Sequence, residues 1–344
     1  MTTLTNRKSQ ILSIIVNDYV NTAAPVASGT VVRSHGLTVS SATVRNEMGA
    51  LEEEGYILRP HISAGGIPSD KGYRYHVQTL GPAQAIAGQD AWFLDTELGS
   101  TPEDVDGWAD AASSALAALL NTLAFATPPR AESTTVKGIE VFRLQELVVM
   151  LVVILQEASI YKQLITLNEA VSESELEATR NRLSEALVGK SVNALEASGP
   201  TPAEPLEQQI IASTADILRK HEAQALRSRR MQGLARLFAQ PELTSQPHQA
   251  RNVVTAIEDG EAFAVLAGEA SADGAPVVLI GRENRQESLH EFSVVVCRYG
   301  VPGQAQGVVG LIAPTRMPYG RAIPVVQYTA SALSSLAGRV YGIG

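Results

Sequence analysis

Arg45 and Asn46 are the neighbouring side chains of this sequence that are best suited to recognition chemistry. In the major groove of DNA, an arginine can donate two hydrogen bonds to O6 and N7 of guanine, and an asparagine can bond to N6 and N7 of adenine. At about 100° per residue, Ala42 and Gly49 share this face of a helix, and both are small enough for close approach to base edges. The combination predicts a helix that reads DNA.

The surrounding stretch supports a helix that begins at Ser40 or Ser41 and ends at Gly55. A serine hydroxyl can accept a hydrogen bond from a free N–H of the first turn, and glycine is favoured just after a helix. Hydrophobic residues recur at the spacing i, i+4, i+7 on the other side of the helix: Val44, Met48 and Leu51. One apolar face and one small polar face suit a helix that lies in a groove.

Two helical patterns precede this helix, and a hairpin pattern follows it. The helical patterns run from Thr5 to about Val20 and from Val26 to Ser34, and Gly36 breaks the second. Tyr56–Arg59 and a glycine-rich turn around Ala64–Gly66 follow the third helix. This order predicts a winged helix-turn-helix in which the hairpin is the wing.

The charge of the chain is unevenly distributed. The net charge of the 344 residues is −9, which by itself argues against a nucleic-acid partner. Residues 1–80, however, contain seven Lys and Arg against six Asp and Glu, a net charge of +1, which leaves −10 on the remainder. A near-neutral N-terminal segment followed by an acidic remainder suits a protein that recognises a DNA sequence without binding strongly to DNA of any sequence.

Motifs of enzymes and metal sites are lacking from the sequence. It contains no HExxH, GxSxG or GxGxxG pattern, and its GKS at Gly189–Ser191 follows an amphipathic helix and lacks the first glycine of a phosphate-binding loop. The single cysteine, Cys297, lies in an apolar run, so we expect a small buried side chain and a reducing, cytoplasmic location. We therefore expect no catalysis, no cofactor and no metal. The longest apolar run, Leu147–Leu155, is too short to cross a membrane.

The rest of the chain alternates between helical and β-type patterns. Glu103–Phe125 has helical spacing, and three β-type runs follow as an expected antiparallel meander whose central strand is buried on both faces: 137–143, 146–155 and 159–167. Helical patterns at 173–187 and 203–238 precede β-type runs at 276–280, 291–298 and 307–313 and a closing helix. This order predicts an α+β fold with a central antiparallel sheet, compatible with a GAF-like fold.

Two parts of the sequence resemble the HrcA family of heat-inducible transcription repressors. The N-terminal run PVASGTVVRSHGLTVSSATVRNEMGALEEEGYILRPHISAGGIPSDKGYRYHV resembles the family's DNA-binding domain. The later runs IGRENRQESLHEFSVVVCRYG and GVVGLIAPTRMPYGR resemble its C-terminal part. Gly66 stands where the family usually has arginine, which leaves the wing with less positive charge, and Ala313 replaces a family glycine.

The resemblance implies a domain order and a function. The expected parts are a winged helix-turn-helix at 1–80, a linker at 81–101, a GAF-like domain at 102–168 and 228–344, and an inserted helical dimerisation domain at 169–227. The implied function is repression of chaperone operons by a homodimer on an inverted-repeat operator of double-stranded DNA. The family further implies that heat lowers the active population and that the chaperonin GroEL keeps the repressor competent.

The DNA contacts expected on this basis lie on the third helix and the wing. Arg45 and Asn46 are expected to read bases, next to the small residues Ala42 and Gly49. Three residues at the helix start are expected to hold phosphates: Ser40, Ser41 and Thr43. Three residues are expected to support the wing: His61, Ser63 and Lys71.

Two alternatives stay open at this point. A small effector could bind the GAF-like domain, in a pocket lined by Val148, Val152 and Val296, although these residues are equally suited to a plain core. A scaffolding role would leave Arg45 and Asn46 unexplained. Arg316, in TRMPYG at a loop-to-helix junction, is expected to pair locally rather than to contact a ligand.

Overall fold

The computed structural model describes residues 4–35, 39–61, 64–81, 85–99, 105–130, 134–156, 159–197, 205–227, 229–258 and 260–340. The chain divides into two compact units, the first formed by residues 1–129, 229–301 and 307–344 and the second by residues 130–228 and 302–306. Both units combine helices with antiparallel sheets, which confirms the expected α+β class.

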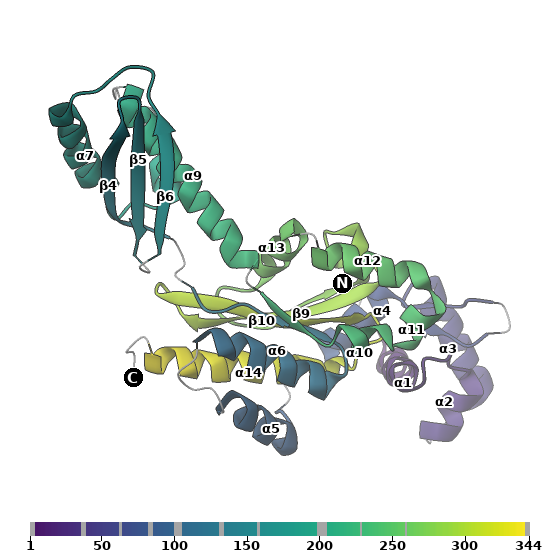
Figure 1. Cartoon of the computed structure of the whole chain (residues 1–344). Helices are drawn as coiled ribbons and strands as arrows, with labels where there is room; N and C mark the ends of the chain where they lie inside the picture. The colour runs from purple at the N-terminus through teal and green to yellow at the C-terminus, as the bar shows by residue number, and fades with distance from the viewer. Residues whose placement is uncertain are drawn as a thin grey trace. The chain divides into compact units, whose positions relative to one another are not determined.

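The N-terminal part of the first unit, coloured purple in Figure 1, consists of helices and one short hairpin. Its elements are α1 (Asn6–Thr22), α2 (Ser28–His35), α3 (Ser41–Glu53), β1 (Ile57–Leu58), β2 (Ile67–Pro68) and α4 (Asp70–Thr79). Three of the four helices begin at a hydroxyl side chain that accepts a hydrogen bond from a first-turn amide: Thr5, Ser40 and Ser69. Local sequence signals therefore place these helices.

A five-stranded sheet with the order β7-β3-β10-β9-β8 forms the centre of the first unit, among the residues that the structure describes. Its strands are β3 (Leu123–Ala126), β7 (Arg230–Gln232), β8 (Val277–Ile280), β9 (Phe292–Val301) and β10 (Ala305–Pro314). The residues of β9 and β10 are almost all buried because helices cover both faces of the sheet. Cys297 lies on β9 and is fully buried, as expected, and burial raises the pKa of its thiol to about 12.

Helices α6 and α14 cover one face of this sheet, and α13 lies against the other (Figure 1). The helices of this part are α5 (Gly88–Gly99), α6 (Val105–Leu120), α10 (Leu234–Phe238), α11 (Pro241–Ser245), α12 (Pro247–Glu258), α13 (Gly260–Glu269) and α14 (Tyr319–Val340). Short 3-10 turns occupy η1 (Gly281–Glu283) and η2 (Glu287–Leu289). On the α13 side, the ring of Phe263 packs edge-on against Phe125, with 5.1 Å between the ring centroids.

The second unit is a three-stranded antiparallel meander covered by helices on one face. Its elements are β4 (Val136–Gln145), β5 (Val148–Leu155), β6 (Ile160–Thr166), α7 (Glu173–Leu187), α8 (Val192–Ala197) and α9 (Pro205–Arg227). Leu151 and Val153 of β5 are fully buried and pack with apolar residues of α7 and α9. The meander predicted from the sequence is confirmed, but burial alternates along β5, so the expectation that both of its faces are buried was wrong.

The structure corrects several expected boundaries. The three strands β4–β6 form their own sheet and core with α7–α9, so they do not belong with the sheet of residues 228–344, and the boundary expected at 169 was wrong. The helix expected over 203–238 ends at Arg227, and β7 follows. The expected linker at 81–101 contains helix α5, which buries Leu94 and Leu98.

No helix among the described residues is both long and apolar enough to cross a membrane.

Candidate nucleic-acid interface

Helix α3 separates an apolar face from a polar one, as its sequence predicts. Val44, Met48 and Leu51 are at most 2% exposed and belong to the core that α3 shares with α1. Arg45 and Asn46 are exposed. Ser40, Ser41 and Ala42 are also exposed, and Thr43 and Gly49 are half-buried. Arg45 and Asn46 therefore share the face opposite Val44 and Met48 with Ala42 and Gly49, while Ser40, Ser41 and Thr43 lie at the start of the helix.

The first turn of α3 is held by its own hydroxyl groups. The Thr43 amide donates to Ser40 Oγ over 3.1 Å, and the two hydroxyl oxygens lie 2.9 Å apart. This cap fixes the start of the helix, where backbone N–H groups and the helix dipole favour an anion. A phosphate is the anion that DNA would place there.

Two carboxylates of α3 are paired with cations from neighbouring elements. Glu47 lies 3.5 Å from Arg7, and Glu52 lies 3.1 Å from Arg59. Glu54, just after the helix, pairs with Lys8. These pairs reduce the negative charge beside Arg45 that would otherwise repel the phosphates of DNA.

The hairpin after α3 is anchored to the loop before α2 by a backbone bridge that the sequence did not reveal. Val26 and Gly66 exchange two backbone hydrogen bonds of 2.9 Å. A Cβ atom at Gly65 would lie only 2.4 Å from the carbonyl carbon of Val26, so this contact requires glycine. His61 at the hairpin turn is exposed, and Ser63 lies outside the described residues.

Gly66 does not point toward the outside of the hairpin. A Cβ atom there would lie 2.9 Å from Ile57 Cδ1 and 3.1 Å from Met48 Cε, both on the apolar side behind α3. A longer side chain at this position would therefore start against the core. The direction of this Cβ does not support the interpretation that glycine removes an outward-pointing cation from the tip of the hairpin.

Lys71 is exposed but already has partners within the protein. Its ammonium donates to the carbonyl oxygen of Glu54 over 2.7 Å and lies 4.3 Å above the centre of the Tyr56 ring. These contacts tie the start of α4 to the end of α3. Lys71 therefore holds the base of the hairpin, and its expected support of a DNA-bound wing stays a prediction.

Two glycines of this part should respond oppositely to alanine. A Cβ atom at Gly49 meets nothing within 4 Å, whereas one at Gly72 would lie 2.1 Å from the carbonyl oxygen of Tyr56. Because glycine is a poor helix residue, Gly49→Ala should raise the free energy of unfolding by about 0.5–1 kcal/mol. Gly72→Ala should lower it by about 1–3 kcal/mol through overlap. Urea denaturation of both variants checks this, and a destabilised Gly49→Ala protein would show that the outer face of α3 is not open.

The effector alternative finds little support in the first unit. Val148 and Val152 lie on β5 of the second unit and Val296 lies on β9 of the first, so the three residues belong to different sheets. A pocket of about 320 Å³ lies beside α4, β8 and α14, and Arg74 contributes to its lining. The Arg74 guanidinium is bound within the protein by the Glu283 carboxylate and by the carbonyl oxygen of Val278, at 2.6 Å from the latter.

Comparison with known proteins places this chain in one family. The family model described as the C-terminal domain of the HrcA protein matches residues 106–323. The heat-inducible transcription repressor HrcA of Herpetosiphon aurantiacus is 33% identical over 345 residues, covering 98% of this chain and 97% of the relative. That of Dehalococcoides mccartyi strain 195 is 34% identical over 339 residues, with the same coverage.

The fold has a counterpart among solved structures. A crystal structure of a protein described as hypothetical has a TM-score of 0.63 and 24% sequence identity, covering 98% of this chain and 99% of that chain. This likeness concerns the fold alone, whereas the sequence matches span nearly the full length of named repressors. From the family model and these relatives together, we conclude that the chain belongs to the HrcA family of heat-inducible transcription repressors.

Proposed function

We propose that this transcription repressor binds its operator through α3, as the recognition helix of a winged helix-turn-helix formed by residues 1–80. The observation that carries this proposal is the outer face of α3, where Arg45 and Asn46 are exposed next to each other while Val44 and Met48 are buried. The names of the relatives support the repressor role. In this assignment, the five-stranded sheet and its helices form the GAF-like part and the second unit dimerises.

Each expected contact residue has a role in this proposal. Arg45 and Asn46 read base edges, while Ala42 and Gly49 let the backbone of α3 approach the groove. The start of α3 holds phosphates through Ser40, Ser41 and Thr43. The hairpin, with His61, Ser63 and Lys71, lies along the neighbouring DNA backbone.

An unpartnered apolar sheet face supports dimerisation through the second unit. The side chains that point away from α7 and α9 include Phe142, Leu164 and Ile160, which are 47%, 63% and 60% exposed. Met150 lies between Phe142 and Leu164 in one cross-strand row, and Ile154 pairs with Ile160 in another. Exposed apolar side chains grouped on one sheet face in this way mark an interaction surface.

We propose that a second copy of the chain covers this face, because the face is self-complementary in charge. In the middle row, Glu140 on β4 and Lys162 on β6 lie on either side of Val152. Within one copy, the Glu140 carboxylate also lies 3.7 Å from the Arg180 guanidinium of α7. A two-fold axis parallel to β5 would place Glu140 of each copy opposite Lys162 of the other. A two-fold dimer in turn matches an operator that is an inverted repeat.

A binding selection from a random pool of duplexes tests the proposed function. With the purified full chain, we expect enrichment of one inverted repeat whose half-sites are bound by the two α3 helices of a dimer. The proposal is wrong if the pool shows no sequence enrichment, or if the enriched motif lacks two-fold symmetry. The selected duplex then serves as the probe for the variants described below.

The regulation implied by the family is part of the same proposal. The inverted repeat is expected upstream of chaperone genes, where the dimer blocks transcription. Heat is expected to lower the binding-competent fraction, and GroEL is expected to restore it, so that mass action couples free chaperonin to repression. Titration of the selected duplex after a heat step, with and without chaperonin, measures this fraction.

A further inference from the structure

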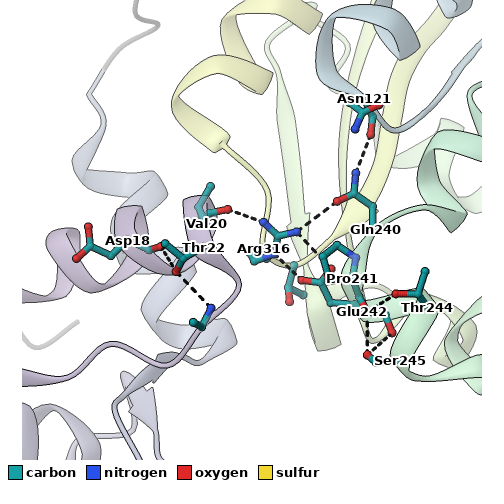
Figure 2. Close-up of polar contacts among 12 residues, drawn as sticks. Asp18, Val20, Thr22, Asn121, Gln240, Pro241, Glu242, Thr244, Ser245 and Arg316 are labelled. Carbon is teal, nitrogen blue, oxygen red and sulfur yellow. Dashed lines mark hydrogen bonds and ion pairs between the residues drawn. The ribbon is translucent and has the colours of Figure 1, made fainter. Parts of the chain in front are cut away.

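The side chain of Arg316 joins segments of the first unit that are far apart in the sequence (Figure 2). Its guanidinium donates to the carbonyl oxygen of Val20 near the end of α1 and to the Glu242 carboxylate of α11. It also donates to Gln240 Oε1 over 3.3 Å. Gln240 in turn donates to the carbonyl oxygen of Asn121 over 2.8 Å. We call these five residues the Arg316 cluster.

The Arg316 cluster provides α1 with the cation that its own sequence lacks. The last turn of α1 contains no basic residue, although a helix end carries unsatisfied carbonyl groups and a partial negative charge. Arg316, which comes from the loop between β10 and α14, occupies that position instead. Its side chain is 12% exposed and that of Glu242 is 20% exposed, so solvent weakens this ion pair less than an exposed one. This agrees with the local, structural role expected for Arg316.

A second set of contacts holds α4 to the same sheet. Asp70 at the start of α4 accepts a hydrogen bond of 3.1 Å from the backbone amide of Arg282. Gly281 allows this approach, because it has a φ of +53° and a Cβ atom there would lie 2.3 Å from the Asp70 carboxylate. One turn later, Arg74 Nε donates to Glu283 over 2.7 Å.

These two sets of contacts hold the N-terminal helices to the sheet at α1 and at α4. Helix α3 packs on α1 in a shared core, so its direction is set by the direction of α1. We propose that Arg316 is a positioning residue for operator recognition. Held by Glu242, it fixes the direction of α3 relative to the five-stranded sheet, and it thereby lets the two α3 helices of a dimer engage two half-sites together. This inference rests on the proposed function.

The expected effect is on the affinity that a dimer gains by binding two half-sites instead of one. When two reading helices are held in fixed directions, binding of the first gives the second a high effective concentration at its half-site. If the Arg316 cluster is broken, each α3 still reads its own half-site, because Arg45 and Asn46 are unchanged. The additional affinity that the second half-site contributes should then fall.

The test compares two duplexes: the inverted repeat selected by the wild-type protein, and the same duplex with one half-site scrambled. The measured quantity is the ratio of the affinities for these duplexes. Arg316→Met should lower this ratio by about tenfold and leave the affinity for the scrambled duplex unchanged. Arg316→Lys should give an intermediate ratio, because an ammonium lacks the planar set of donors that reaches several acceptors at once.

Two further variants make the result unambiguous. Glu242→Gln is the milder variant, because it keeps the volume at position 242 and the bond from Arg316 to Val20, and it should also lower the ratio. Arg285→Met is the matched control, since Arg285 is 75% exposed and pairs with Glu269 outside the cluster. It should leave the ratio unchanged.

Three outcomes would overturn the inference. The first is a wild-type ratio in both folded cluster variants. The second is an equal loss of affinity for both duplexes, which would indicate loss of the folded population instead of misdirection of α3. The third is a wild-type protein that gains nothing from the second half-site, which would contradict the proposed dimeric binding itself and is visible before any variant is made.

Discussion

Replacing both Phe142 and Leu164 by glutamate is expected to convert the protein to a monomer. Both side chains lie on the exposed sheet face of the second unit, in the same cross-strand row, and their exposure in the single chain allows glutamate without disturbing the core. In a dimer, the four added carboxylates would be buried between the copies without partners, at a cost of several kcal/mol. The affinity for the inverted repeat should fall by a factor on the order of 100 or more, because the second half-site no longer contributes.

Sedimentation equilibrium measures the oligomeric state of this variant, and titration of the selected duplex measures the loss of affinity. A matched control replaces Trp92 and Leu234, which are 70% and 38% exposed in the first unit, by glutamate. This control carries the same added charge and loses exposed apolar surface in the same way, yet it should remain a dimer. A Phe142→Glu, Leu164→Glu protein that sediments as a dimer would show that another surface joins the copies.

Arg45→Ala is expected to reduce the preference of the protein for operator DNA over other DNA while leaving its fold intact. Arg45 is exposed on α3, so truncation removes no core contact. A bidentate arginine–guanine pair contributes about 1–3 kcal/mol of discrimination, so the ratio of operator affinity to scrambled-duplex affinity should fall by about 5- to 150-fold. Asn46→Ala should act in the same direction at a different base.

Lys71→Ala is the variant with which Arg45→Ala is compared, because it should affect all duplexes equally. A lysine that contacts phosphate contributes to every duplex alike, so this variant should weaken both affinities together and reduce their salt dependence. The ratio of the two affinities should stay the same as in the wild type. If Arg45→Ala keeps the wild-type ratio in the same gel-shift titrations, α3 is not the helix that reads the operator.

Local signals in the sequence predicted the N-terminal elements correctly. Hydroxyl residues at the start of α1 and α3 and the apolar spacing of α3 act within one or two turns, so they can be read without knowing the fold. The same holds for the strands β8, β9 and β10, whose runs of β-branched residues stand out in the sequence.

Sheet membership could not be predicted in the same way, because it depends on distant partners. Leu123–Ala126 continues a helical pattern, yet it becomes β3 by pairing with β10 and with β7. Residues 230–232 also lay inside an expected helix. Directly after the strand, Gly233 has a φ of +88° and would place a Cβ atom 2.1 Å from the carbonyl oxygen of Thr122, a contact that only the folded chain shows.

The candidate interface likewise combines features that the local sequence determines with features that depend on distant contacts. The placement of Arg45 and Asn46 follows from helix periodicity alone. The bridge from Val26 to the hairpin, the inward direction of Gly66 and the partners of Lys71 depend on segments that meet only in the folded chain. The roles of single residues in the hairpin were therefore less predictable than those in the helix.

The burial of Cys297 on β9 also determines how this protein can respond to its surroundings. Its thiol is the only one in the chain, it is 0% exposed, and its pKa of about 12 leaves almost no thiolate at neutral pH. Peroxides and disulfides react with thiolate, so an oxidant has no cysteine to modify while β9 stays covered. Signalling through cysteine oxidation is thus closed to the folded repressor, and its one sulfhydryl becomes reactive only when the five-stranded sheet opens.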